Sequence, residues 1–442
     1  MQSFFTKASG LTILFCVLTF TSAPASADFV GWLKWLFKIP ATPETPVEPD
    51  PTEPGDPIEY PDGLRPAIFV GNNWDGTIDV IDGDNYEVLG RINGIPDYQE
   101  RMEELWSNPG DHIVFLGIRQ LIGEGNDQFV DDMYSTNDGE LLIVSRPSFA
   151  DVVALDLTTG DIAWRFEVDG ARSDHMALSP DGTQVAVSAS TGNVVHLLNV
   201  RTGEEEGRFP TGNSPHENLY SDDGKYIYHS SIGYVFMPFD GKLLRDTTRG
   251  ERKFLVYDTE LGQIVKDFDI KTKLEEAGLG HLSPAIRPMA HTSDYRYFYF
   301  QLSFLHGLIE FDMEEEKVTR LAELPNLIPH ALKITYVNDS AHHGLAMSKD
   351  DSKLCVAGTM SDYAAIVDRE TFEYTILEDL GEKPYWAVTD RSGKNCIISW
   401  SATDQVSVIN YESGEEIKRI DVGNHPQRVR EGMLKIDWTS LY

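Results

Sequence analysis

The sequence predicts an all-β protein: a seven-bladed β-propeller of four-stranded antiparallel blades, closed by its C-terminal strand. Three observations predict it. One strand–turn–strand pattern recurs seven times, a second such pattern stands ahead of six of these copies, and the first copy is one strand short while the chain ends with one strand too many. A four-stranded sheet buries little surface alone, so seven such units are expected to stack into a ring.

The sevenfold pattern is a strand that ends in Asp or Asn, a tight turn, and a second strand. "VVALDLTTGDIAWRF" and "VSVINYESGEEIKRI" are two of its copies. Asp and Asn favour this place because their side chains bond to the backbone of the turn that follows. We therefore expect "DGDN" at the first copy to be a turn, although it imitates the start of a calcium loop. The residues that begin the turns are Asp82, Asp156, Asn199, Asp258, Asp312, Asp368 and Asn410.

The second pattern supplies the inner half of each blade, as in "MALSPDGTQVAVS" and "NLYSDDGKYIYHS". Turn residues between two short apolar runs are typical of hairpins. The first unit, "AIFVGNNWDGTIDVIDGDNYEVLGRI", has only three strands, and "NHPQRVREGML" near the end is a strand without a blade. We expect the last strand to complete the first blade, since two solitary edges would otherwise be exposed.

Two stretches, "IFVGNNWDGTIDVID" and "HMALSPDGTQVAVS", resemble YVTN-type β-propeller repeats, and the resemblance covers about residues 67–434. That superfamily also includes the haem d1 domain of cytochrome cd1 nitrite reductase, the amine dehydrogenase heavy chain and lactonase-type propellers. The resemblance thus implies the fold, together with a range of functions that spans binding, redox and lactone chemistry. A fold does not carry one function with it.

The first 27 residues read as a cleavable export signal. Lys7 precedes the apolar run "LTILFCVLTF", and "APASA" supplies the small residues that a signal peptidase reads, so cleavage is expected after Ala27. The run is too short for a membrane span. We therefore expect a periplasmic or secreted protein.

Three further segments flank or interrupt the predicted ring. Residues 28–40, "DFVGWLKWLFKIP", form an aromatic amphipathic piece for which a membrane interface, a partner groove and packing onto the folded domain all stay open. Residues 41–66 are a Pro-rich acidic linker, and residues 435–442 a C-terminal tail. The longest insertion, residues 94–128, is helical by composition, and such loops often carry specificity. Shorter insertions are expected at 236–252, 271–283 and 325–340.

Charge and cysteine content narrow the partners. The chain carries 71 acidic and 37 basic residues, a net charge of −34, which repels nucleic acid, so we expect no nucleic-acid partner. We also expect a monomer. Cys355 and Cys396 follow Lys in the matching segments "DDSKLCVAG" and "RSGKNCIIS". Aligned in this way, both point to the same face of neighbouring blades, so a disulfide between them is not expected.

The heads of the inner strands carry the candidate site. Strand heads from separate blades converge around the central channel of a propeller, although they are far apart in sequence. Counting back seven residues from the same place in each inner turn gives Asp131, Asp174, His216, Arg287, His343 and Tyr385, and the C-terminal strand begins with His425. The residues that follow these heads add Asp132, His175, Glu217 and Trp386. The predicted ligand-contacting residues are His216, Arg287, His343, His425, Asp174, His175, Glu217 and Asp131.

Imidazole, guanidinium and carboxylate groups around one axis suit a metal ion, a small anionic ligand or proton transfer. A purely structural role for these residues at the strand heads stays open as well. Since neighbouring residues on a strand point to opposite faces, at most one of His342 and His343 faces the channel. The chain has no C-x-x-C-H, so no covalently attached c-type haem is expected, and it has no H-E-x-x-H or G-x-S-x-G motif. No other cofactor is specified.

With no complete catalytic motif, the leading interpretation is a binding scaffold for a protein, a small anion or a metal, through the channel mouth and the insertions. The alternative that the resemblance implies is a channel-mouth enzyme of lactonase type, or an oxidoreductase like the amine dehydrogenase and haem d1 propellers.

Overall fold

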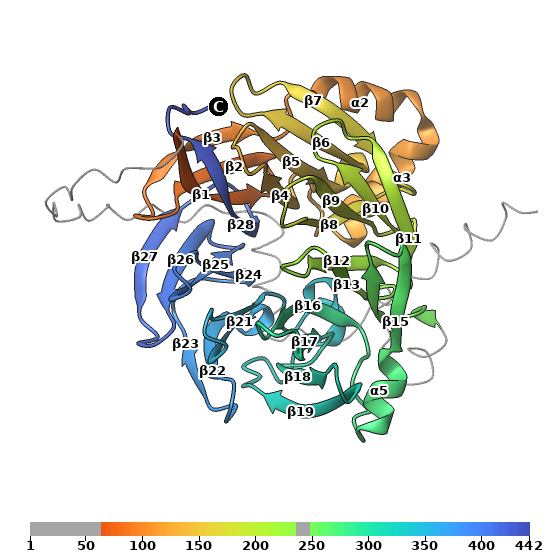
Figure 1. The fold of residues 1–442 in the computed structure, drawn as a ribbon, viewed down its shortest axis with the longest axis vertical. Helices are drawn as coiled ribbons and strands as arrows, with labels where there is room; N and C mark the ends of the chain where they lie inside the picture. Colours follow the sequence, from red (N-terminus) through yellow and green to blue (C-terminus); the bar gives the residue numbers. More distant parts are fainter. Residues whose placement is uncertain (1–62, 236–247) are drawn as a thin grey trace, which may run out of the picture. The chain divides into compact units, whose positions relative to one another are not determined.

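The computed structural model describes residues 63–235 and 248–442, and these form seven four-stranded antiparallel sheets arranged as a ring (Figure 1). The predicted signal, residues 28–40 and nearly all of the predicted linker lie outside the described residues. The first three blades contain β1 (Leu64–Asn72), β2 (Thr77–Asp82), β3 (Val88–Asn93) and β28 (Pro426–Lys435); β4 (Asp132–Ser135), β5 (Leu141–Arg146), β6 (Asp151–Asp156) and β7 (Ile162–Glu167); and β8 (Ser173–Leu178), β9 (Gln184–Ala189), β10 (Val194–Asn199) and β11 (Glu205–Pro210).

The fourth to seventh blades repeat the arrangement. They contain β12 (Pro215–Tyr220), β13 (Tyr226–Ser231), β14 (Lys253–Asp258) and β15 (Gln263–Asp269); β16 (Ile286–His291), β17 (Tyr297–Leu302), β18 (Gly307–Asp312) and β19 (Lys317–Glu323); β20 (Leu345–Met347), β21 (Lys353–Gly358), β22 (Tyr363–Asp368) and β23 (Tyr374–Leu377); and β24 (Pro384–Thr389), β25 (Asn395–Trp400), β26 (Gln405–Asn410) and β27 (Glu416–Asp421).

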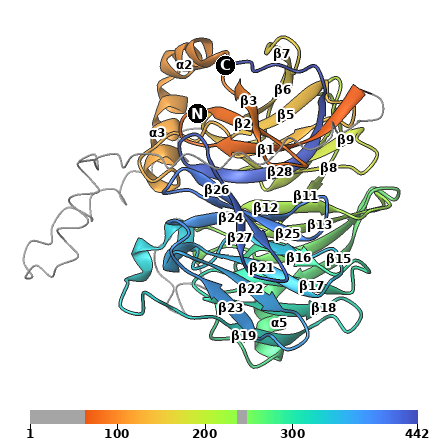
Figure 2. The ribbon, with the colours of Figure 1, turned by 90° about the vertical axis from the view of Figure 1, so that its left-hand side faces the viewer.

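The ring closes through its C-terminal strand, as predicted. β28 pairs antiparallel with β1, from Leu64 opposite Lys435 to Asn72 opposite Pro426, and so supplies the inner strand of the first blade. Beyond it, Leu441 bridges to Ile92 of β3. In Figures 1 and 2 the two ends of the described chain lie in this one blade, so no blade is left with an open inner edge.

The core lies between the faces of adjacent blades. Middle strands such as β25 ("NCIISW") are buried at every position, whereas the outermost strands alternate, as β11 ("EEGRFP") does. A strand covered on both faces reads as a continuous apolar run, and one that faces water on one side alternates. One cluster joins Phe69 and Val80 of the first blade to Leu142 and Val153 of the second.

The seven predicted turns form as the Asp and Asn pattern requires. At each one a side-chain oxygen accepts the backbone N–H groups of the second and third residues that follow; at Asp156 these belong to Thr158 and Thr159, at 2.7 and 3.1 Å. "DGDN" at Asp82 is such a turn, because Asp82 accepts from Asp84 and Asn85. The expectation of a turn at this place is confirmed.

Insertions interrupt the repeated blades, and residues 236–247 of the predicted 236–252 insertion lie outside the described residues. Residues 94–128 contain α2 (Tyr98–Ser107) and α3 (Pro109–Leu121), which Figure 2 shows together at one edge. Elsewhere in residues 63–235 and 248–442 the helical segments are α5 (Ile270–Glu276) and the short 3-10 turns η2 (Pro147–Phe149), η3 (Lys333–Thr335), η4 (Val337–Asp339) and η5 (Thr359–Ser361). Within the described residues, no helix has the length and apolar character needed to cross a membrane.

The cysteine prediction was wrong: Cys355 and Cys396 form a disulfide that joins the sixth and seventh blades. The sheet register gives the reason. Lys353 lies opposite Asp368 and Asn395 lies opposite Asn410, so Lys353 and Asn395 are equivalent places. Cys355 comes two residues after Lys353, whereas Cys396 comes only one residue after Asn395. The two side chains therefore leave opposite faces of their blades and meet in the interface between them.

Candidate functional site

A small buried cavity lies where the inner strands converge. Its volume is about 70 Å³, and one inner-strand head from each of the second to seventh blades lines it, together with two residues of β28. At this size it suits an ion or a molecule of a few atoms. The strand-end residues that line it are Asp131, Asp174, His216, Arg287, His343, Tyr385, Gln427 and Arg428.

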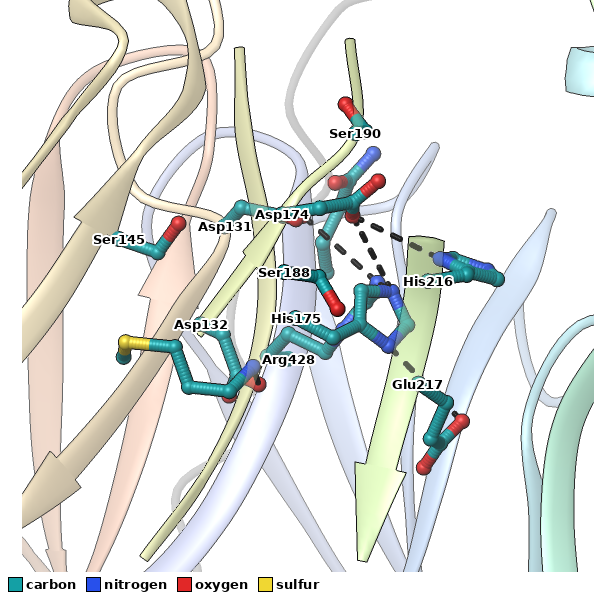
Figure 3. A network of polar contacts seen from close by, with 12 residues as sticks. Asp131, Asp132, Ser145, Asp174, His175, Ser188, Ser190, His216, Glu217 and Arg428 are labelled. Carbon is teal, nitrogen blue, oxygen red and sulfur yellow. Dashed lines mark hydrogen bonds and ion pairs between the residues drawn. The ribbon is translucent and has the colours of Figure 1, made fainter. Parts of the chain in front are cut away.

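Bulges at the strand heads explain how two consecutive residues reach this region. In the third blade, Ser173 lies opposite Ala189 and Met176 opposite Val187, so Asp174 and His175 share a single partner position. The same shift occurs before Asn218 in the fourth blade, at His216 and Glu217. A bulge inserts an extra residue, bends the strand and re-aims its side chains. Asp174 and His175 therefore both approach the axis, as Figure 3 shows.

Three imidazoles from three blades gather beside the cavity. The ring centroids of His175 and His216 are 3.9 Å apart, and those of His216 and His343 are 5.8 Å apart. One nitrogen from each ring lies within 4.8 Å of the other two. All three side chains are buried. In the sequence these histidines are 41 and 127 residues apart, so the arrangement of the blades around one axis brings them together.

Most charges around the imidazoles are paired. Arg172 donates to Asp174 at 2.5 Å, and Arg430 donates to both oxygens of Asp132 at 2.8 Å. Arg428 lies 3.7 Å from an oxygen of Asp131. A second set of potential ligands, Asp131 with Asp174 and His175, is thus already occupied by guanidinium groups.

Arg287, the remaining predicted cation, is held in place by neutral acceptors. Its guanidinium donates to the hydroxyl of Ser303 at 3.1 and 3.2 Å and to the backbone oxygen of Asn338. Burial lowers the pKa of Arg287. Its head is therefore fixed at the wall of the cavity.

Burial dominates the protonation of the cluster. It lowers the pKa of His216 to about 4 and holds those of His175 and His343 well below their usual range, with Arg428 adding to the effect for these two. Burial raises the pKa of Glu217 to about 7 and that of Asp131 to about 6.

Asp174 behaves differently from the other buried carboxylates. Burial works to raise its pKa, but Arg172 and His216 together lower the pKa below its usual range. The imidazoles are accordingly neutral at pH 7, and Asp174 is charged.

Several buried polar atoms in this region have no hydrogen-bond partner among the described residues. They include both ring nitrogens of His216, Nδ1 of His175, Nε and Nη1 of Arg428, and one oxygen each of Asp131 and Glu217. An unsatisfied buried polar group costs about 1–3 kcal/mol. Such a concentration at one place favours a site that is completed by something bound.

His425 lies apart from the cavity lining. Its ring stacks on Trp74, with centroids 3.7 Å apart, and its Nε2 lies 3.2 Å from Nε2 of Gln427. Strand register explains why His425 is not a strand head. Pro426 pairs with Asn72 in the first blade as Pro215 pairs with Ser231 in the fourth, so the two prolines are equivalent. Gln427 thus takes the place that His216 has in the fourth blade, with Arg428 after it.

Sequence reasoning missed Gln427 and Arg428 as cavity residues. One signal could have found them: Pro precedes His216, Tyr385 and Gln427 alike. Aligning the C-terminal strand on this Pro, instead of on its histidine, selects Gln427. Arg172 and Gln128 also line the cavity, and they stand outside the strand-head pattern.

Of the adjacent pair, His343 lines the cavity and His342 does not. His342 Nε2 lies 2.9 Å from the Tyr363 hydroxyl, away from the cluster. The expectation that at most one of the two faces the channel is confirmed.

A larger cavity, of about 350 Å³, lies between α2, α3 and the second blade. Its cation, Arg101, is already paired with Glu104 and lies 3.3 Å from Asp151. The smaller axial cavity, with its unpaired polar atoms, is therefore the stronger candidate site.

Comparison with known proteins identifies the fold and goes no further. No protein-family model matches the chain, and no curated protein does. Among solved structures, "Kuenenia stuttgartiensis Hydrazine Synthase" is similar over 78% of this chain and 92% of that chain, with a TM-score of 0.55 and 16% sequence identity. The match supports a propeller. At this identity it shows the fold alone.

Proposed function

We propose that this protein is an exported binding propeller that holds a small ligand in its axial cavity. The observation that carries the proposal is the group of buried, unpaired polar atoms where inner strands from different blades meet. A structural polar network is expected to satisfy its own members. Here Nε and Nη1 of Arg428 and both ring nitrogens of His216 have no hydrogen-bond partner among the described residues, which favours a bound ligand.

Size and chemistry limit the ligand. A cavity of about 70 Å³ takes a metal ion or a small anion, and is well below the ~300 Å³ or more of a typical drug-sized site. Neutral imidazoles offer lone pairs to a metal, and guanidinium groups offer donors to an anion. Either ligand would complete groups that the protein alone leaves unsatisfied.

The cellular setting belongs to the same proposal. Export rests on the signal-like residues 1–27, and residues 28–40 are proposed to contact a membrane interface or a partner. A protein partner would use the rim insertions, where Trp106 is 65% exposed and Ile113 is 70% exposed. The net charge of −34 makes nucleic acid an unsuitable partner. We propose a monomer.

One observation favours an enzyme as the second candidate. A carboxyl oxygen of Glu217 lies 3.8 Å from Nδ1 of His175, and burial raises the pKa of Glu217 to about 7. A carboxyl group poised near neutral pH suits proton transfer. The lactonase alternative stands on this pair, whereas the oxidoreductase alternative rests on the resemblance to the amine dehydrogenase and haem d1 propellers alone.

The test is paired binding and stability. Protein purified from its own host is analysed for bound metal by elemental analysis and for bound small molecules by mass spectrometry and absorption. His216→Gln, Arg287→Gln and His343→Gln are then compared with the control His342→Gln for ligand retention and melting temperature. We expect His216→Gln and His343→Gln to lose the ligand whether it is a metal ion or an anion, Arg287→Gln to lose it only if it is an anion, and the control to keep it.

Two outcomes would contradict the proposal. One is a native protein that retains no small species. The other is retention that falls only in variants whose melting temperature falls in parallel, His342→Gln included, since that is the signature of a structural role. His216→Gln is the most informative variant, because His216 makes no hydrogen bond to any described residue and only a 3.6 Å contact with the Asp174 carboxylate.

A further inference from the structure

The three-histidine cluster resolves which of the two ligand classes fits better. We propose that His175, His216 and His343 bind one first-row divalent transition-metal ion of the zinc or copper class. This inference rests on the proposed binding function and deepens it by naming the ligand.

The donor atoms are the first argument. Three imidazole nitrogens from separate blades lie within 4.8 Å of one another and are buried. In a tetrahedral site with metal–nitrogen bonds of about 2.0–2.1 Å, neighbouring nitrogens are about 3.4 Å apart. Side-chain movements on the order of 1 Å therefore bring the ligands into bonding range.

The orientation of each ring is the second argument. His343 Nδ1 lies 3.2 Å from the backbone oxygen of Tyr385, so this nitrogen carries the proton and Nε2 keeps its lone pair. His216 Nδ1 lies 3.6 Å from a carboxylate oxygen of Asp174. Histidines that bind metals usually direct their other nitrogen at a carbonyl or a carboxylate, which fixes the tautomer.

His175 follows the same rule. Arginine can only donate, so the hydrogen bond from Arg428 makes His175 Nε2 an acceptor and leaves the proton on Nδ1. That nitrogen lies 3.8 Å from Glu217 (Figure 3). His175 and His343 thus present Nε2 as the lone-pair atom, and each of the three rings has an oxygen acceptor near Nδ1.

The donor set selects the metal. Imidazole suits zinc, copper, iron and nickel, whereas magnesium and calcium prefer oxygen ligands. The oxygen-rich alternative, Asp131 with Asp174, is unsuitable because Arg172 is already paired with the Asp174 carboxylate. Three protein ligands leave a further coordination position, and the adjoining cavity of about 70 Å³ has room for a small ligand there.

Arg428 is the competing cation. Its donation to His175 Nε2 must be released when a metal takes that nitrogen, and its charge repels the ion. Removing the guanidinium is therefore expected to leave metal affinity unchanged or to raise it. An anion site would behave in the opposite way.

The experiment uses the untagged full chain, since a histidine tag would itself bind metal. The metal-free protein is titrated with Co²⁺, followed by its visible absorption, and with Zn²⁺, followed by calorimetry. We expect one equivalent to bind. His216→Gln and His343→Gln should each weaken binding about 100-fold or more, the control His342→Gln should match the wild type, and Arg428→Gln should bind at least as tightly.

Three results would overturn the metal assignment: no stoichiometric binding, cluster variants that bind like the wild type, or loss of binding in Arg428→Gln. The wider proposal fails separately. If a small anion copurifies and the cavity variants release it while no metal binds, the metal assignment is wrong and the binding function stands. If neither is found, both fail.

Discussion

The outer turns and the inner strand heads of the same blades follow opposite rules. At the turns, Asp or Asn occurs in all seven copies, and its side-chain oxygen accepts two backbone N–H groups each time. At the heads, the residues in equivalent places are Asp131, Asp174, His216, Arg287, His343, Tyr385 and Gln427.

The difference separates structural from functional demand. A turn needs the same acceptor in every blade, because the backbone it completes is the same in every blade. The heads keep no common chemistry, although the strands that carry them are alike. They also leave polar atoms without partners, which the turns do not. Repetition therefore marks what the ring needs for folding, whereas the variation among the heads is what the proposed binding site would require.

The largest expected effect on stability comes from a deletion that removes part of the strand-head region and opens the ring. Deleting residues 424–434 removes β28, with Gln427 and Arg428 of the cavity and the inner strand of the first blade. We expect loss of cooperative unfolding, because a whole edge and its interface with the second blade become exposed. Thermal denaturation followed by circular dichroism measures it. A truncated chain that melts as sharply as the full chain would refute the closure.

The disulfide stabilises the ring without touching either region. Cys355 and Cys396 enclose a separation of 41 residues, for which the chain-entropy estimate is roughly 3–4 kcal/mol. The double variant Cys355→Ala, Cys396→Ala should lose about this much free energy of unfolding in urea, with ligand binding unchanged. A midpoint that equals that of the oxidised wild type would show that the bond contributes little.

A matched pair of single substitutions sharpens the comparison most directly. Asp156→Ala takes the acceptor from two backbone N–H groups and should cost about 1 kcal/mol or more, with no effect on binding. His216→Gln removes no hydrogen bond and should cost less stability while weakening binding. Chemical denaturation and ligand titration of both variants are the measurements. The reverse pattern would mean that the heads, and not the turns, hold the ring together.

The smallest effect is a pH dependence at one turn. Backbone and side-chain donation from Thr371, together with Lys353, lowers the pKa of Asp368 to about 2. In the unfolded chain this carboxylate takes up its proton near pH 4, so its stabilisation is present above that pH and is lost as the pH falls toward 2. Stability should therefore decline on acidification through this window.

Asp368→Asn is the matched test, because Asn199 and Asn410 already make the same turn contacts in other blades. The variant keeps the acceptor and cannot titrate. Urea midpoints at pH 4 and pH 2 should differ less for the variant than for the wild type. Equal differences would show that Asp368 contributes nothing to acid sensitivity.

The sequence by itself determined the local and repeated features. The strands, the turns at Asp156 and its six equivalents, the three-stranded first blade and six of the seven head positions all follow from short-range patterns, because turn chemistry and strand periodicity act over a few residues. That at most one of His342 and His343 faces the channel also follows from alternation along a strand.

The tertiary structure decided the rest, for one physical reason: the side on which a residue leaves a strand depends on register, and register is set by the partner strand. The sheet register of the sixth and seventh blades differs by one residue from the alignment on lysine, and this difference places Cys355 and Cys396 on facing sides, where they form a disulfide. Pairing of β28 with β1 placed Gln427 and Arg428 at the cavity and left His425 stacked on Trp74. Bulges turned His175 and Glu217 toward the axis, and closure of the ring then brought imidazoles from three blades within reach of one ion.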